Sequence, residues 1–156
     1  MSLTVGTAAP RFKLPHKPGE EVDVGALIGK EKVVLLFFPL AFSSVCTEEM
    51  CHFRDDWSDW QSLGCSVFGI SIDSPFVTDK FRTELRVPFP ILSDFNKTVS
   101  ASYDALHAEL LGLKGVTKRA AVVIGSDGKV AYTWEAEIPK TQVDFAALRA
   151  AVASTR

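Results

Sequence analysis

The fold of this chain is decided between residues 32 and 54, which read KVVLLFFPLAFSSVCTEEMCHFR. Residues 33–38 are all apolar, and a run without alternation predicts a strand that is covered on both faces of its sheet. A short turn over residues 39–45 follows the strand, and a helical pattern follows the turn. We therefore expect a buried strand that leads directly into a helix.

The helix is predicted to run from Val45 to Leu63, because apolar side chains recur along it every three or four residues. This buried stripe consists of Cys46, Met50, Phe53, Trp57 and Trp60. Cys46 is its first member and stands at the start of the helix. The free N–H groups and the dipole of a helix N-terminus stabilise negative charge, so a thiol placed there is a candidate reactive thiolate.

The rest of the chain alternates between strand and helix patterns. It predicts a strand over residues 65–72, a helix over 75–85, a short edge strand within 87–92, a helix over 96–103, and a hairpin of strands 120–124 and 129–134. Residues 125–128, Gly-Ser-Asp-Gly, form a strong turn signal for that hairpin. A final helix is expected to open at Thr141, with Asp144 in place of the usual glutamate of a capping box.

This order of elements predicts an α/β protein of the thioredoxin-like fold, in which a central mixed sheet is flanked by helices. The residues before Lys32 would form an N-terminal extension, and those between Pro75 and Tyr103 an insertion. With 156 residues, of which 47% are hydrophobic and 23% charged, the chain is expected to form one domain over residues 1–156.

Charge and cysteine content exclude several classes of protein. A net charge of −2 gives no reason to expect nucleic acid or an anionic membrane surface as a partner. No apolar run approaches the ~18 residues of a membrane span, and the first residues lack the pattern of a secretory signal. Three cysteines are few and odd in number, so we expect a cytoplasmic chain with free thiols.

The spacing Pro39-x-x-x-Ser43-x-x-Cys46 resembles the Pro-x-x-x-(Thr/Ser)-x-x-Cys signature of the peroxiredoxins. The resemblance extends over most of the chain and is greatest to the bacterioferritin-comigratory-protein-like and alkyl-hydroperoxide-reductase-E-like branches; it includes residues 5–12, 35–42, 92–94 and 116–129. It implies a thiol-dependent peroxidase that reduces hydrogen peroxide and organic hydroperoxides without a metal or other cofactor. Ser43 replaces the commoner threonine of the signature.

The resemblance also implies roles for the residues of the signature. Cys46 would be the peroxidatic cysteine, which attacks the peroxide as a thiolate and becomes a sulfenic acid. The Ser43 hydroxyl would bind and orient the peroxide, and Pro39 would shield the sulfur from water. Ser43 and Ser44 are alternatively candidates for capping the helix.

A thiolate at Cys46 needs a cation, because Glu48 and Glu49 place negative charge in the same helical turn. In peroxiredoxins an arginine that enters a late strand packs against the cysteine, and Arg119 before residues 120–124 matches it. An arginine keeps its charge and offers several donors at once. Glu49 matches an acidic position in many members and is expected to orient Arg119. Lys118 is the alternative cation.

Cys51 lies five residues after Cys46, where one branch of the family often has a resolving cysteine. Five residues along an intact helix separate the Cα atoms by about 8.6 Å, whereas a disulfide tolerates at most ~7 Å. Disulfide formation therefore requires the first helical turns to unwind, after which thioredoxin or a similar dithiol would restore both thiols. In the alternative, one-cysteine cycle, an external thiol reduces the sulfenic acid directly.

Other classes of function are less consistent with the pattern. Cys46, Cys51 and His52 lack the spacing of metal ligands, and His52 is placed too far around the helix to serve as a base for Cys46. Cys65 begins a buried strand and is expected to pack in the core. A non-enzymatic peroxide sensor that oxidises a partner protein stays open as an alternative to the enzyme. The sequence leaves the preferred peroxide open, and equally whether the protein is a monomer or a homodimer.

Overall fold

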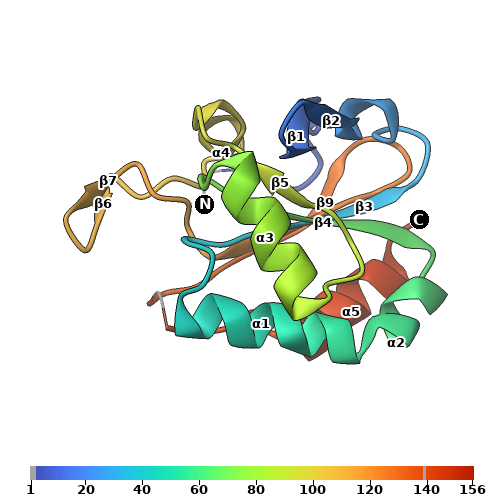
Figure 1. The fold of residues 1–156 in the computed structure, drawn as a ribbon. Coiled ribbons are helices and arrows are strands. Elements are labelled where there is room, and N and C mark those ends of the chain that lie inside the picture. Colours follow the sequence, from blue (N-terminus) through green and yellow to red (C-terminus); the bar gives the residue numbers. More distant parts are fainter. Residues whose placement is uncertain (1–2, 139) are drawn as a thin grey trace.

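A five-stranded mixed sheet in the order β5-β4-β3-β8-β9 forms the centre of the computed structural model, which describes residues 3–138 and 140–156 (Figure 1). The central strand β3 (Lys32–Phe37) runs parallel to β4 (Cys65–Ser71) and antiparallel to β8 (Ala120–Ile124). At the edges, β5 (Ile91–Ser93) pairs parallel with β4, and β9 (Val130–Glu135) pairs antiparallel with β8.

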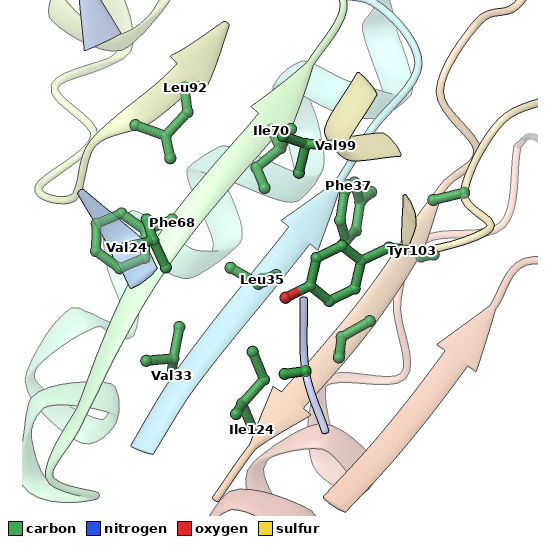
Figure 2. Packing of buried hydrophobic residues seen from close by; sticks show 14 of the residues in the cluster. Val24, Val33, Leu35, Phe37, Phe68, Ile70, Leu92, Val99, Tyr103 and Ile124 are labelled. Atoms are coloured by element: carbon green, nitrogen blue, oxygen red, sulfur yellow. The ribbon is translucent and has the colours of Figure 1, made fainter. Parts of the chain in front are cut away.

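The apolar run in β3 is explained by its position, because both faces of the sheet are covered. Side chains of a strand point alternately to opposite faces, and those of Val33, Leu35 and Phe37 enter one buried cluster. Figure 2 shows Leu35 and Phe37 of this cluster beside Tyr103. The intervening side chains, Val34 and Leu36, enter a second cluster on the opposite face.

Three helices cover the face of the second cluster: α1 (Ser44–Asp55), α2 (Trp57–Ser62) and α5 (Phe145–Ser154) (Figure 1). The other face is covered by the hairpin of β1 (Lys13–Lys17) and β2 (Glu20–Asp23), the 3₁₀ turn η1 (Val24–Ala26) and α4 (Thr98–Ser102). Helix α3 (Pro75–Leu85) packs beside the edge strand β5. Within the described part of the chain, no helix combines the length and apolarity needed to traverse a bilayer.

A small hairpin of β6 (Glu109–Leu110) and β7 (Leu113–Lys114) projects from the body of the fold (Figure 1). The residues at its tip, Leu111 and Gly112, both adopt positive φ. Leu111 is 88% exposed. The hairpin therefore adds little to the core, and its importance lies in where it stands, beside the candidate site described below.

The predicted thioredoxin-like fold is confirmed, but the long helix over residues 45–63 is wrong. The chain leaves helical geometry at Asp56 (φ −100°, ψ 16°), which separates α1 from α2. The Asp56 carboxylate lies 3.2 Å from Arg149 Nη2 and 3.5 Å from His52 Nδ1. Aspartate favours helix ends over helix interiors, and these partners hold it at such an end. The apolar stripe survives the break, since Trp60 on α2 is fully buried with Met50 and Phe53.

The start of the last helix also differs from the prediction. Helix α5 begins at Phe145, and its N-cap is Asp144, whose carboxylate accepts the Ala147 amide at 3.0 Å. The predicted capping box opening at Thr141 is therefore wrong. Residues 141–144 are outside any helix, and the Val143 amide in this stretch is bound to a side chain of α1.

We predict that Leu35→Ala lowers the free energy of unfolding by about 2–5 kcal/mol, because Leu35 is completely buried between β4 and β8 and the cavity left behind cannot fill. The measurement is urea denaturation followed by circular dichroism. Leu111→Ala, at an 88% exposed position, is the matched control and should change the value by less than about 0.5 kcal/mol. Equal effects of the two changes would contradict the assignment of the core.

Candidate active site

The turn between β3 and α1 places Cys46 in the first turn of the helix. Ser43 is the N-cap residue, so Cys46 is the third helical residue, and its side chain is fully buried. The turn is fixed by the Ala41 amide, which donates to Asp73 Oδ2 in the loop after β4 at 2.8 Å. Phe42 adopts φ 67°, a conformation that costs a residue with a Cβ roughly 1–2 kcal/mol. Such strain is typical of functional turns.

Arg119 lies against this cysteine. It immediately precedes β8, and because Ala120 pairs with Phe37, Arg119 stands at the end of β3 from which the turn to Cys46 departs. Its guanidinium is only 3% exposed, and Nη2 donates to the Cys46 sulfur at 3.0 Å. A full positive charge, shielded from water, therefore faces the sulfur at hydrogen-bond distance.

The same guanidinium is shared with Glu49. Arg119 Nη1 lies 3.0 Å from Glu49 Oε2, and the other carboxylate oxygen, Oε1, accepts the Val143 amide at 2.8 Å. Glu49 is 2% exposed. It follows Cys46 by three residues, so the two side chains lie on the same face of α1. Burial raises the pKa of the Glu49 carboxyl, while the charge of Arg119 and the Val143 amide oppose that rise. With both oxygens bound, Glu49 fixes the plane of the guanidinium.

The alternative cation, Lys118, points to a different partner. Its ammonium lies 3.0 Å from Glu135 Oε1 on the edge strand β9. Adjacent residues of an extended chain point to opposite sides, so only one of the two cations can face the cysteine. In this structure it is Arg119.

A pocket of about 240 Å³ lies beside Arg119 and the turn that leads to Cys46. It is lined by Pro39, Leu40, Ser43, Ser44, Val45, Leu110, Leu111, Arg119 and Lys140. Two of these leucines belong to the projecting β6–β7 hairpin, so one wall is apolar and comes from a segment far along the chain. The pocket thus combines two charged side chains, the buried Arg119 and the exposed Lys140, with mostly apolar walls.

Pro39 and Ser43 both line this pocket but differ in exposure. Pro39 is buried and Ser43 is exposed. The Ser43 hydroxyl donates to the Leu40 carbonyl oxygen at 2.8 Å and makes no capping hydrogen bond to α1. Ser44 is the first helical residue, inside the cap position. Ser43 therefore occupies the N-cap position without a side-chain cap, Ser44 is not the cap residue, and the Ser43 oxygen keeps lone pairs available to a ligand.

All three cysteines are free thiols. Cys51 is half-buried on the same unbroken helix as Cys46. Cys65 begins β4 and is half-buried, with its sulfur 3.8 Å from the Trp60 carbonyl oxygen, and burial raises the pKa of its thiol. The described residues contain no cluster of side chains suited to a metal ion.

Some residues of the site carried no signal in the sequence. The Val143 amide is a backbone group, and Lys140 lies in an irregular segment far from the signature. Leu110 and Leu111 belong to strands of only two residues, too short for a periodic pattern. The sequence Leu110-Leu111-Gly112-Leu113, an apolar run interrupted by a turn residue, is a weak signal from which a hairpin could have been predicted, but the sequence analysis did not predict one.

Comparison with known proteins gives the class of this site. Residues 5–133 match the model of the AhpC/TSA family. A putative peroxiredoxin bcp of Coxiella burnetii is 37% identical over 147 residues, which cover 92% of this chain and 93% of that protein. Peroxiredoxin Bcp of Escherichia coli is 28% identical over 146 residues, 85% of this chain and 86% of that protein. The crystal structure of peroxidoxin BcpB from Mycobacterium tuberculosis covers 99% of both chains with a TM-score of 0.86 and 31% identity.

The chain therefore belongs to the AhpC/TSA family. Within it, these relatives place the chain in the Bcp-like branch of the peroxiredoxins. It is a thiol-dependent peroxidase, an antioxidant enzyme that reduces peroxides.

We predict that Arg119→Met lowers the rate at which peroxide oxidises the enzyme about 10²-fold, the effect expected from losing one charge-assisted hydrogen bond. It should also lower the free energy of unfolding by about 3–5 kcal/mol, because Glu49 is left buried and unpaired. Stopped-flow fluorescence and urea denaturation measure the two quantities.

Two further variants separate the effects. Arg119→Met/Glu49→Gln should recover stability without recovering the rate, since no charge faces Cys46. Lys118→Met removes a half-buried pair with Glu135 that does not contact Cys46, so it should leave the oxidation rate nearly unchanged and lower the free energy of unfolding by less than Arg119→Met does. A fast Arg119→Met enzyme would show that the guanidinium is dispensable.

Proposed function

We propose that Cys46 is the peroxidatic cysteine. Its thiolate attacks one oxygen of the peroxide, an S–O bond forms as the O–O bond breaks, and the departing oxygen takes up a proton and leaves as water or an alcohol. The cysteine becomes a sulfenic acid and the peroxide is reduced by two electrons. The observation that carries this assignment is the Arg119–Cys46 contact of 3.0 Å in a buried site.

Arg119 has two tasks in this step. Before the reaction it stabilises the thiolate, and during it the guanidinium faces the negative charge that develops on the peroxide oxygens. Because Glu49 and the Val143 amide already hold the guanidinium, it needs no reorientation when the peroxide binds. Glu49 is in this sense a positioning residue that acts through Arg119.

Ser43 and Pro39 complete the first step in our proposal. The Ser43 hydroxyl, on the pocket wall, binds the peroxide and aligns its O–O bond with the sulfur. Pro39, buried at the inner end of the turn, keeps water from the thiolate. Both positions are supported by the pocket that these residues share with Arg119.

Cys51 is the proposed resolving cysteine. Its sulfur attacks the Cys46 sulfenic acid, an S–S bond forms as the S–O bond breaks, and the hydroxyl group leaves as water with the proton of Cys51. Since α1 is continuous from Ser44 to Asp55, the helix must unwind around residues 46–51 before the sulfurs meet. We further propose that thioredoxin or a similar dithiol reduces this disulfide, and that the enzyme works in the cytoplasm as a single domain.

Two alternatives concern the later steps. In a one-cysteine cycle the sulfenic acid would be reduced directly by an external thiol, and the half-buried position of Cys51 would be incidental. A peroxide sensor would pass its oxidation to a partner protein. We favour the two-cysteine route because a second free thiol lies on the same helix, separated from Cys46 by little more than one turn.

The test is stopped-flow oxidation of the wild type and of Cys46→Ser, Cys51→Ser and Cys65→Ser, followed by peptide mapping and turnover with thioredoxin. Cys46→Ser should lose all reaction. Cys51→Ser should form sulfenic acid at the normal rate but no disulfide, and should lose turnover with thioredoxin. Cys65→Ser is the matched control and should behave as the wild type.

Two outcomes would contradict the proposal. An unmodified Cys51 beside oxidised Cys46 in the wild type would favour the one-cysteine cycle. A single oxidation that thioredoxin cannot reverse would favour the sensor.

A further inference from the structure

The segment of residues 142–145, which leads into α5, is bound to α1 at the very turn that must unwind. Gln142 Nε2 donates to Glu48 Oε2 at 3.2 Å, and the Val143 amide donates to Glu49 Oε1 at 2.8 Å. Glu48 and Glu49 both lie between Cys46 and Cys51 in the sequence. Unwinding the helix between Cys46 and Cys51 moves Glu48 and Glu49, and therefore weakens or breaks these two hydrogen bonds.

A third contact extends this attachment just past Cys51. The rings of His52 and Phe145 are stacked, with centroids 3.6 Å apart and planes 14° apart. Phe145 also meets Phe53 edge-on, with centroids at 5.1 Å. Four residues of α1, at positions 48, 49, 52 and 53, are therefore contacted by one short segment that is remote in sequence.

The contacts that α5 makes farther along its length do not involve the residues between the two cysteines. Arg149 binds Asp56 at 3.2 Å and lies 3.8 Å from Asp59, at the end of α1 and on α2. These residues follow Cys51 by five and eight positions, outside the stretch that joins the two cysteines. Unwinding around residues 46–51 leaves them in place, so they provide an internal comparison.

We propose that residues 142–145 control the second chemical step by keeping α1 wound until the sulfenic acid has formed. The inference rests on the proposed function of Cys51 as the resolving cysteine. In the reduced enzyme the segment holds Glu49, and through it Arg119, in the geometry that the first step requires. After oxidation the same contacts oppose the unwinding that brings Cys51 to Cys46, and so set how long the sulfenic acid persists.

This control has a chemical consequence, because the sulfenic acid has two fates. Attack by Cys51 gives the disulfide and releases water, whereas a second peroxide molecule adds one more oxygen to the sulfur, gives the sulfinic acid and is itself reduced. Weaker contacts from residues 142–145 shorten the life of the sulfenic acid. They therefore favour the disulfide and protect the enzyme at high peroxide concentration.

The variants for the test are Gln142→Ala, Phe145→Leu and the two combined. Gln142 is half-buried, and leucine keeps an apolar side chain at position 145 while removing the ring stack. Each single change should speed disulfide formation about 2- to 5-fold and the double change about 10-fold, the range expected for losing one or two modest contacts. Sulfenic acid formation should stay within about twofold of wild type, because Arg119 and Cys46 are untouched.

The measurements are the first-order rate of disulfide formation by stopped-flow fluorescence and the sulfinic acid yield at excess hydrogen peroxide by mass spectrometry. Arg149→Ala is the control, since it loosens α5 from α1 beyond Cys51. It should change the melting temperature without changing either readout. A merely structural role for residues 142–145 would shift the melting temperature and leave the partition between disulfide and sulfinic acid unaltered.

The possible failures are distinguishable. A wild type that forms no Cys46–Cys51 disulfide would refute the resolving role of Cys51, and the present proposal with it. A wild type that forms the disulfide at the same rate as the double variant would refute the control by residues 142–145 alone. An equal acceleration by Arg149→Ala would likewise overturn it, because any loosening of α5 would then suffice.

Discussion

One buried guanidinium organises the candidate active site of this enzyme. Arg119 donates to the Cys46 sulfur and to Glu49 from two different nitrogens, in surroundings from which water is almost absent. Desolvating a guanidinium and a carboxylate is costly, and a buried pair is maintained only where good geometry and further hydrogen bonds compensate. The Val143 amide provides one such bond to Glu49. In the proposed mechanism, the reaction at the sulfur thus depends on three segments that meet at one point.

The sheet brings those segments together. Because β3 lies between β4 and β8, the turn that follows β3 and the residue that precedes β8 come to the same end of the sheet. The parallel neighbour β4 ends there too, and its following loop binds the turn through Asp73. The fixed spacing between the strands of a sheet therefore holds these segments in place at the start of α1.

Sequence reasoning found the parts of this arrangement that are encoded locally. The apolar run of β3, the spacing from Pro39 to Cys46 and the position of Arg119 before a strand are each visible over a few residues. It failed where distant partners decide the local structure. The break at Asp56 depends on Arg149 of α5, and the late start of α5 depends on the contact between Val143 and Glu49. A backbone amide has no letter of its own in the sequence, so no pattern reveals such a contact.

The register of β3 with β4 also isolates the third sulfur. Cys65 pairs with Lys32, the first residue of β3, whereas Cys46 follows the last residue of that strand. Five residue steps along the sheet correspond to about 16 Å, a gap that no disulfide spans. Within one molecule, then, the sheet keeps Cys65 out of reach of Cys46, and Cys51, on the same helix as Cys46, is the nearer of the two other thiols.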